Sequence, residues 1–168
     1  MKEKKYAMNT IQEFFKTFEY SMINEAVALL QKTLDVEERE IESPPMLNWR
    51  QIREMSNNGI DFGAHTVTHV NLSGVSSGQA EEEINDSKKI IEENINKPVY
   101  GFAYPYGLEQ HFNGQTKKNV KNSGFHYACS AITGIISIGS DIYSLKRVSM
   151  PNVSLPISIW NICKNIKK

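Results

Sequence analysis

Residues 62–69, FGAHTVTH, contain two histidines four positions apart, His65 and His69. Neutral imidazole is a common ligand of zinc and similar divalent metals. Side chains at this spacing share a face if the segment makes one turn, whereas in a straight strand they would lie about 13 Å apart. The pair therefore indicates two ligands of one metal ion, provided that the chain turns near His65. The alternative is a chance spacing of two histidines. The sequence has no His-Glu-x-x-His pattern, so a zincin protease is not indicated.

A second candidate feature is the segment FAYPYG at residues 102–107. Pro105 lacks an N–H and fixes its own φ, while Gly107 permits an unusual backbone angle. A rigid turn of this kind at a strand end can direct the Tyr106 backbone N–H at a developing oxyanion. Tyr104 and Tyr106 are also candidates for the walls of a sugar-binding groove. The alternative is an ordinary Pro-Gly turn with buried tyrosines.

The elements around both motifs follow from the spacing of apolar residues. Residues 9–34 predict one long helix or two short ones, and residues 37–45 read as a charged segment and linker. From there the pattern predicts helices at 48–55, about 78–97 and 115–122, with strands at 60–64, 99–104, 125–130 and 143–148. This alternation is typical of an α/β fold with mainly parallel strands, whose sites gather at the carboxyl ends of the strands.

Composition excludes several classes of function. The 168 residues carry 19 basic and 19 acidic side chains, so no basic excess favours nucleic acid as a partner. Cys129 and Cys163 form no CxxC pattern, and we expect both to be buried free thiols. No apolar run approaches a membrane span, and no signal peptide is recognised. As written, the chain is expected to be soluble and cytoplasmic; a lost upstream segment would allow a location outside the cytoplasm.

Residues 47–55 and 59–73 resemble the region around the second motif of polysaccharide deacetylases, the NodB homology family, and residues 102–107 resemble its third motif. Residues 83–89, 123–125 and 145–148 resemble the helix between these motifs and two later strands, so the similarity extends from residue 46 to about 150. The resemblance implies a distorted (β/α) barrel. It also implies a metal-dependent hydrolase that removes N-acetyl groups from an amino-sugar polysaccharide or its precursor.

Individual roles follow from the same resemblance. It implies that His65 and His69 bind the metal, that Thr66 steadies their loop, and that the Tyr106 backbone N–H is an oxyanion donor. Zn²⁺ is the expected metal, although Co²⁺, Ni²⁺ or Fe²⁺ also suits imidazole ligands. The expected partner is an N-acetylated polysaccharide or oligosaccharide, and the sequence does not indicate an oligomeric state.

The chain departs from the family pattern at three points. It lacks the Thr-Phe-Asp-Asp-Gly strand that supplies the base and third metal ligand, and Asp61 lies too far along its strand to replace it. Ala103 replaces an arginine, for which Arg147 is a substitute unless its role is purely structural. No late Leu-x-His motif occurs, and we expect His111 and His126 to be surface or strand histidines.

These departures imply an N-terminally incomplete barrel. In this interpretation residues 1–45 are a helical segment and linker inserted in the longer fold, and residues 46–168 are a partial deacetylase domain. Such a domain would expose apolar edges, and we expect poor solubility. A non-catalytic, carbohydrate-binding or partner-binding descendant of the fold is the alternative function, and a helical interaction protein with incidental histidines is the least favoured.

Overall fold

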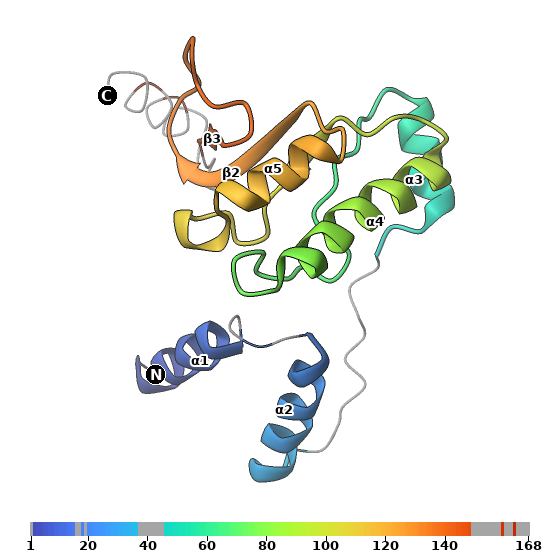
Figure 1. The fold of residues 1–168 in the computed structure, drawn as a ribbon. Coiled ribbons are helices and arrows are strands. Elements are labelled where there is room, and N and C mark those ends of the chain that lie inside the picture. The colour runs from blue at the N-terminus through green and yellow to red at the C-terminus, as the bar shows by residue number, and fades with distance from the viewer. Residues whose placement is uncertain are drawn as a thin grey trace.

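The computed structural model describes residues 2–15, 18, 20–36, 46–148, 159 and 163. Along the chain it contains α1 (Lys2–Phe15), α2 (Tyr20–Thr33), α3 (Trp49–Asn57), α4 (Ser77–Ile95), β1 (Gly101–Ala103), the 3₁₀ helix η1 (Glu109–His111), α5 (Gly114–Asn122), β2 (Tyr127–Thr133) and β3 (Leu145–Arg147) (Figure 1). The predicted helical region 9–34 is thus two helices. From α4 onward the predicted order of helices and strands is observed, whereas no strand lies between α3 and α4.

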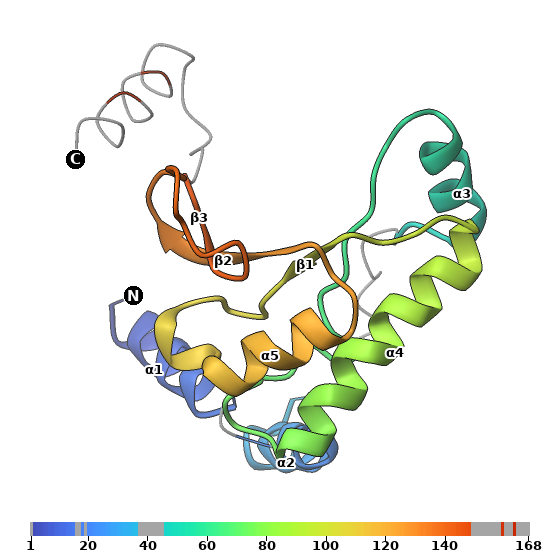
Figure 2. The same cartoon turned by 45° about the horizontal axis from the view of Figure 1, so that its top comes forward.

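The three strands form one parallel sheet in the order β1-β2-β3. Gly101 pairs with Tyr127 and Ala103 with Cys129, so β1 and β2 start in register and β2 continues beyond the end of β1 to Thr133. Helices α4 and α5 lie side by side on one face of this sheet (Figure 2). The prediction of parallel strands is therefore confirmed, and both sequence motifs lie near the carboxyl end of β1.

The predicted strand at 60–64 is wrong, because only Ala64 joins the sheet. Ala64 forms an isolated parallel bridge with Phe102, in which its N–H donates to the Gly101 carbonyl at 3.0 Å. Its own carbonyl accepts from the Ala103 N–H at 2.9 Å. Ile60 is exposed, whereas Phe62 packs against the core without joining the sheet.

Side-chain caps explain where the helices begin. The Asn48 carboxamide accepts from the Gln51 N–H at 3.0 Å, and the Gln51 side chain accepts in return from the Asn48 N–H at 2.9 Å. This reciprocal pair satisfies two backbone donors that the first turn of α3 would otherwise leave unpaired. Asn113 caps α5 in a similar way, through the Gln115 and Thr116 N–H groups. The predicted start at residue 48 is confirmed.

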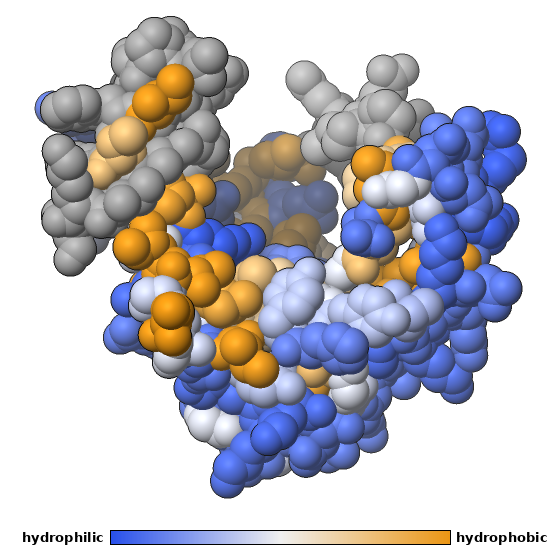
Figure 3. Space-filling model, turned by 90° about the horizontal axis from the view of Figure 1, so that it is seen from above, coloured by the Kyte–Doolittle hydropathy of each residue, from blue (hydrophilic) through white to orange (hydrophobic). Residues whose placement is uncertain are grey.

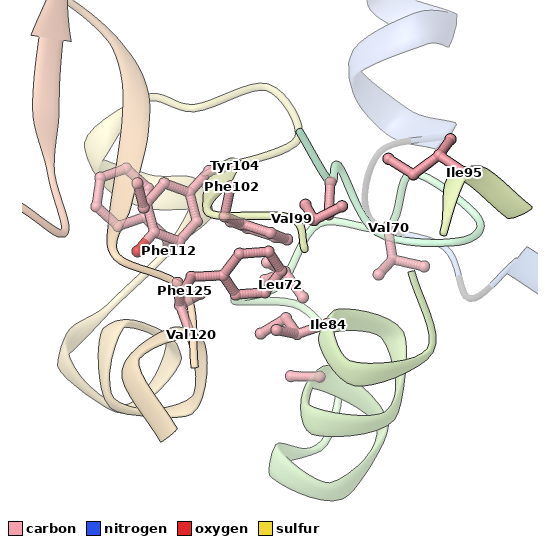
Figure 4. Packing of buried hydrophobic residues seen from close by; sticks show 13 residues of the cluster. Val70, Leu72, Ile84, Ile95, Val99, Phe102, Tyr104, Phe112, Val120 and Phe125 are labelled. Carbon is pink, nitrogen blue, oxygen red and sulfur yellow. The ribbon is translucent and has the colours of Figure 1, made fainter. Parts of the chain in front are cut away.

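The hydrophobic core lies between the sheet and the helices α4 and α5 (Figure 4). Its buried side chains are Ala64, Val70, Leu72, Ala80, Ile84, Ile95, Val99, Phe102, Tyr104, Phe112, Val120, Phe125 and Ala128. The rings of Tyr104 and Phe112 stack with centroids 4.1 Å apart, and that of Phe102 lies 5.2 Å from Phe125. Helix α1 contributes no buried residue, and among the described residues Ile52 and Phe62 pack against the core from before residue 64.

Two charged residues of α4 fix the segment that leads into β1. The Lys88 ammonium donates to the Val99 carbonyl and to the Glu92 carboxylate, each at 2.6 Å. The same carboxylate oxygen of Glu92 accepts from the Val99 N–H at 2.8 Å. Both polar groups of the Val99 backbone are therefore bonded to the helix before the sheet begins.

The two cysteines are less buried than the sequence suggested. Cys129 is only partly buried and Cys163 is exposed, so the prediction of two buried thiols is wrong, although both are free.

Apolar side chains are visible on the face seen from above (Figure 3). The exposed apolar residues of the β2–β3 connection are Ile135, Ile136, Ile138 and Ile142. Within the described residues, no helix has the length and apolar character of a membrane span.

Candidate functional site

The turn at residues 65–69 brings the two histidines together immediately after the Ala64 bridge. The ring centroids of His65 and His69 are 4.8 Å apart, with the ring planes nearly perpendicular. Thr66 and His69 have φ values of 62° and 60°, in the left-handed region that β-branched residues such as threonine rarely adopt. The chain thus turns where the metal prediction requires it, through left-handed residues instead of a turn of helix.

A backbone carbonyl fixes the tautomer of His65. Its Nδ1 lies 2.7 Å from the carbonyl oxygen of Ala103, the last residue of β1. Because a carbonyl oxygen can only accept, Nδ1 carries the proton, and in the neutral ring Nε2 keeps its lone pair. Metal-binding histidines use their second ring nitrogen in this way, which orients the ring. His65 is therefore prepared to bind a cation through Nε2.

The environment of His69 favours its neutral form. Partial desolvation of the ring lowers the pKa of His69, and the nearby His65 imidazole lowers it further, although the residue as a whole remains exposed. Only the neutral imidazole offers a lone pair to a metal. The ring also meets that of Tyr106 edge to face, with centroids 4.8 Å apart. These features make His69 a suitable second ligand.

The Tyr-Pro-Tyr-Gly turn is held tightly against β2. The Gly107 N–H donates to the Pro105 carbonyl at 2.6 Å, and the Gly107 carbonyl accepts from the Ala131 N–H at 2.7 Å. Gly107 has φ +66°, and a Cβ at this position would lie 2.6 Å from the Ala131 nitrogen. Tyr106, at φ 60°, is also left-handed. The turn thus has one backbone arrangement, and glycine is required within it.

Tyr104 does not lie where the sequence prediction put it. Its side chain is only 1% exposed, and its hydroxyl donates to the Tyr143 carbonyl at 2.9 Å. Burial raises the pKa of Tyr104 far above its usual range, so the phenol stays protonated. Its ring packs on Phe112 in the core, which excludes the predicted substrate contact. Of the two tyrosines, Tyr106 alone is partly exposed and adjoins the histidines.

Arg147 is anchored away from the histidines. Its Nε donates to the Ser130 carbonyl at 2.5 Å, across the β2–β3 pair. This position agrees with the structural role that the sequence left open for Arg147.

His111 contradicts the expectation of a surface or strand histidine. It is 6% exposed, belongs to η1, and its ring centroid lies 5.3 Å from that of Tyr106. Its Nδ1 accepts from the Leu108 N–H at 3.2 Å. The Tyr106 ring therefore contacts the rings of both His69 and His111. No local pattern in the sequence signals this neighbour, because it depends on the path of the chain after the turn.

Residues of the N-terminal helical segment lie beside His69 and Tyr106, although they are distant in sequence. Phe15 at the end of α1, Phe18, and Ile23 of α2 line a cavity of about 110 Å³ together with His69 and Tyr106. Phe15 and Phe18 also contact each other, with ring centroids 5.9 Å apart. The helical segment thus supplies an apolar side to the histidine site, which the sequence did not predict.

The residues present fit part of a metal site. His65 and His69 converge, and one has a defined free nitrogen, but the described residues contain no cluster of three or more His, Cys, Asp or Glu side chains. A catalytic zinc site usually has three protein ligands and one open position. The described histidine pair would supply two of these ligands.

Comparison with known proteins identifies the family. A model of the family described as polysaccharide deacetylase matches residues 9–128. The chain belongs to the polysaccharide deacetylase family. The match confirms the resemblance over residues 46–128 and extends it toward the N-terminus, to residue 9.

Known deacetylases share this fold. YxkH of Bacillus subtilis (strain 168), whose name refers to a polysaccharide deacetylase, is 29% identical over 102 residues, which is 61% of this chain and 36% of YxkH. The Streptococcus pyogenes deacetylase PplD, solved with acetate, superposes with a TM-score of 0.64 at 27% identity over 75% of this chain and 53% of PplD. BC0361, a polysaccharide deacetylase from Bacillus cereus, superposes with a TM-score of 0.63 at 25% identity. The match covers 73% of this chain and 38% of BC0361.

The comparisons confirm the predicted fold class. The parallel sheet with its helices is that of the NodB-type deacetylases, an α/β distorted barrel, of which this chain holds a part. The chain spans about a third of YxkH and about half of PplD. The family supports a hydrolase that acts on acetyl groups of polysaccharides.

Proposed function

We propose that this deacetylase is a metal-dependent hydrolase that removes N-acetyl groups from an amino-sugar polysaccharide or its precursor. The observation that carries the proposal is the convergence of two imidazoles, 4.8 Å apart, with the Nδ1 of His65 committed to the Ala103 carbonyl. The chain spans only part of its relatives, so the proposal concerns the protein that includes this segment. We infer that its substrate class is N-acetylated cell-surface polysaccharide.

Each group at the site has a proposed task. His65, through Nε2, and His69 would hold a divalent metal, for which Zn²⁺ is the first choice and Co²⁺, Ni²⁺ or Fe²⁺ alternatives. When bound, such a metal polarises the amide carbonyl and activates water. The Tyr106 backbone N–H would stabilise the oxyanion, and its ring would border the sugar. Arg147 is the weakest part of this assignment because its Nε is bonded to Ser130.

Metal binding and acetate release test the proposal together. We expect zinc titration by calorimetry to show binding that His69→Ala weakens at least tenfold, because one ligand is lost. Acetate release from oligomers of N-acetylglucosamine should fall to background in chelator. His126→Ala is the matched control, since His126 is exposed and stacks on Tyr100 away from the pair. Binding that His69→Ala leaves unchanged would contradict the proposal.

A non-catalytic binding domain is the second candidate function. The described residues provide two convergent histidines and no third ligand of the His, Cys, Asp or Glu type, which favours this alternative. It predicts binding of N-acetylated oligosaccharide without acetate release. It also predicts that His69→Ala leaves this binding unchanged while Tyr106→Ala weakens it.

The location of the protein belongs to the proposal as well. A polymer outside the cytoplasm would require the enzyme there, whereas a precursor could be modified inside. Cell fractionation with an antibody against residues 77–95, followed by assay of each fraction, would distinguish the two.

A further inference from the structure

The carboxylate of Glu83, on α4, lies against the turn that joins the two histidines. Its Oε2 accepts from the backbone N–H of Val67 at 2.7 Å and from that of Thr68 at 2.9 Å. Its Oε1 accepts from the Thr68 hydroxyl at 2.6 Å. One side chain therefore binds three donors of the two residues in the middle of the turn, and the donors come from 15 and 16 positions earlier in the chain.

The turn needs an external support of this kind. Thr66 and His69, on either side of the Glu83-bound pair, both have left-handed φ values. Such angles persist in non-glycine residues only when the surroundings enforce them. The Thr66 hydroxyl, which the family resemblance suggested as the stabilising group, is buried and makes no hydrogen bond within the described residues. Successive N–H groups bound to one carboxylate supply the support instead.

Helix α4 holds the carboxylate in position. The next residue, Ile84, is fully buried in the core, and Ala80 one turn earlier is buried as well. The part of α4 that carries Glu83 is thus anchored in the core, while the Glu83 side chain itself is partly exposed. The contact between helix and turn is a link from the core to the histidines.

We propose that Glu83 is a positioning residue, which sets the relative orientation of His65 and His69 by fixing the backbone between them. Whether this role matters for catalysis rests on the proposed function. The hydrogen bonds from the turn to Glu83 do not depend on that function. The test therefore measures the histidines directly, without a metal.

The test compares Glu83→Ala and Glu83→Gln with Glu82→Gln, a charge-matched control on an exposed neighbour. In Glu83→Ala we expect amide hydrogen exchange at Val67 and Thr68 to accelerate by roughly tenfold or more, because two charge-assisted hydrogen bonds are lost. The nuclear Overhauser contact between the His65 and His69 rings, whose centroids are 4.8 Å apart, should disappear. Glu83→Gln should retain part of both signals, since its carboxamide oxygen still accepts, and Glu82→Gln should retain both fully.

A second variant keeps the test valid if Glu83→Ala fails to fold. Thr68→Val removes only the hydroxyl contact, and we expect it to weaken the His65–His69 contact less than Glu83→Gln does. Ring contacts and exchange rates in Glu83→Gln that equal those of Glu82→Gln would overturn the proposal. If the unsubstituted protein shows slow exchange at Val67 and Thr68 and the His65–His69 ring contact but releases no acetate, the result would count against the proposed function alone.

Discussion

At the scale of single residues, backbone groups determine what the site side chains can do. The Ala103 carbonyl selects the tautomer of His65, and the left-handed angle of Thr66 turns the chain so that His69 faces its partner. The side-chain types give the chemistry, but a carbonyl and two dihedral angles give the geometry. The same holds for the Tyr106 turn, where the shape depends on Gly107.

Gly107→Ala should therefore reduce stability sharply. A methyl group at this position combines a left-handed φ of +66° with a 2.6 Å approach to the Ala131 nitrogen. We expect a loss of at least about 1–3 kcal/mol in the free energy of unfolding, measured by urea denaturation. Gly78→Ala is the control, because a Cβ there meets nothing within 4 Å, and the change should be under about 1 kcal/mol in the stabilising direction. Equal effects of the two substitutions would contradict the argument.

At the scale of elements, α4 connects the core, the histidine turn and the entry to β1. Ile84 and Ile95 pack into the core, Glu83 binds the turn, and Glu92 with Lys88 binds Val99. Burial alone would raise the pKa of Glu92, but the hydrogen bonds from Lys88 and the Val99 N–H outweigh it and lower the pKa. Because the folded-state pKa lies below the unfolded value, this carboxylate stabilises the fold above the unfolded pKa.

Glu92→Gln should expose that pH dependence. At pH 7 we expect a loss of about 1 kcal/mol in the free energy of unfolding, since the carboxamide accepts more weakly from Lys88 and Val99. The difference from the unsubstituted protein should shrink as the pH falls from the unfolded value of 4.5 through the lower folded pKa, where the carboxylate is protonated. Urea denaturation at pH 7 and pH 3 measures it. Glu93→Gln, at an exposed position, should show little loss at either pH.

At the scale of the whole molecule, the chain brings its first residues to a site built much later in the sequence. Helices α1 and α2 lie outside the α/β region (Figure 1), and Phe15 and Ile23 nevertheless share a cavity with His69 and Tyr106. The family match includes most of this segment, from residue 9 onward. The division at residue 45 into an inserted segment and a deacetylase domain stays a prediction.

Phe15→Ala should make His69 more reactive. Removing the ring enlarges the cavity that borders His69, so we expect diethylpyrocarbonate to modify His69 faster by about twofold or more, as followed by peptide mass spectrometry. His126, which stacks on Tyr100, provides an internal standard in the same digest. Met8→Ala removes an exposed apolar side chain from the same helix and should leave the rate unchanged. An unchanged rate in Phe15→Ala would show that α1 does not shield the site.

Local rules predicted much of the α/β region. The Asn48 cap, the parallel strands and the convergence of His65 with His69 all follow from residue types and spacing over a few positions. The failures involve contacts that span longer distances. The sequence predicted Tyr104 as a groove residue, but contacts with the distant residues Phe112 and Tyr143 bury it. No local pattern predicted the hydrogen bond from Val67 to Glu83. The metal, the substrate and the poor solubility remain predictions.

The distance along α4 between Glu83 and Glu92 has an evolutionary consequence. Nine residues of helix correspond to about 13.5 Å, and each inserted or deleted residue would rotate one end against the other by about 100°. A length change within this interval would therefore detach either the histidine turn or Val99. Insertions before the Ser76 cap carry no such penalty. We expect homologous chains to vary in length near the exposed residues 73–74 and to keep the interval from 83 to 92 constant, so that α4 sets the distance between the histidine turn and the start of the sheet.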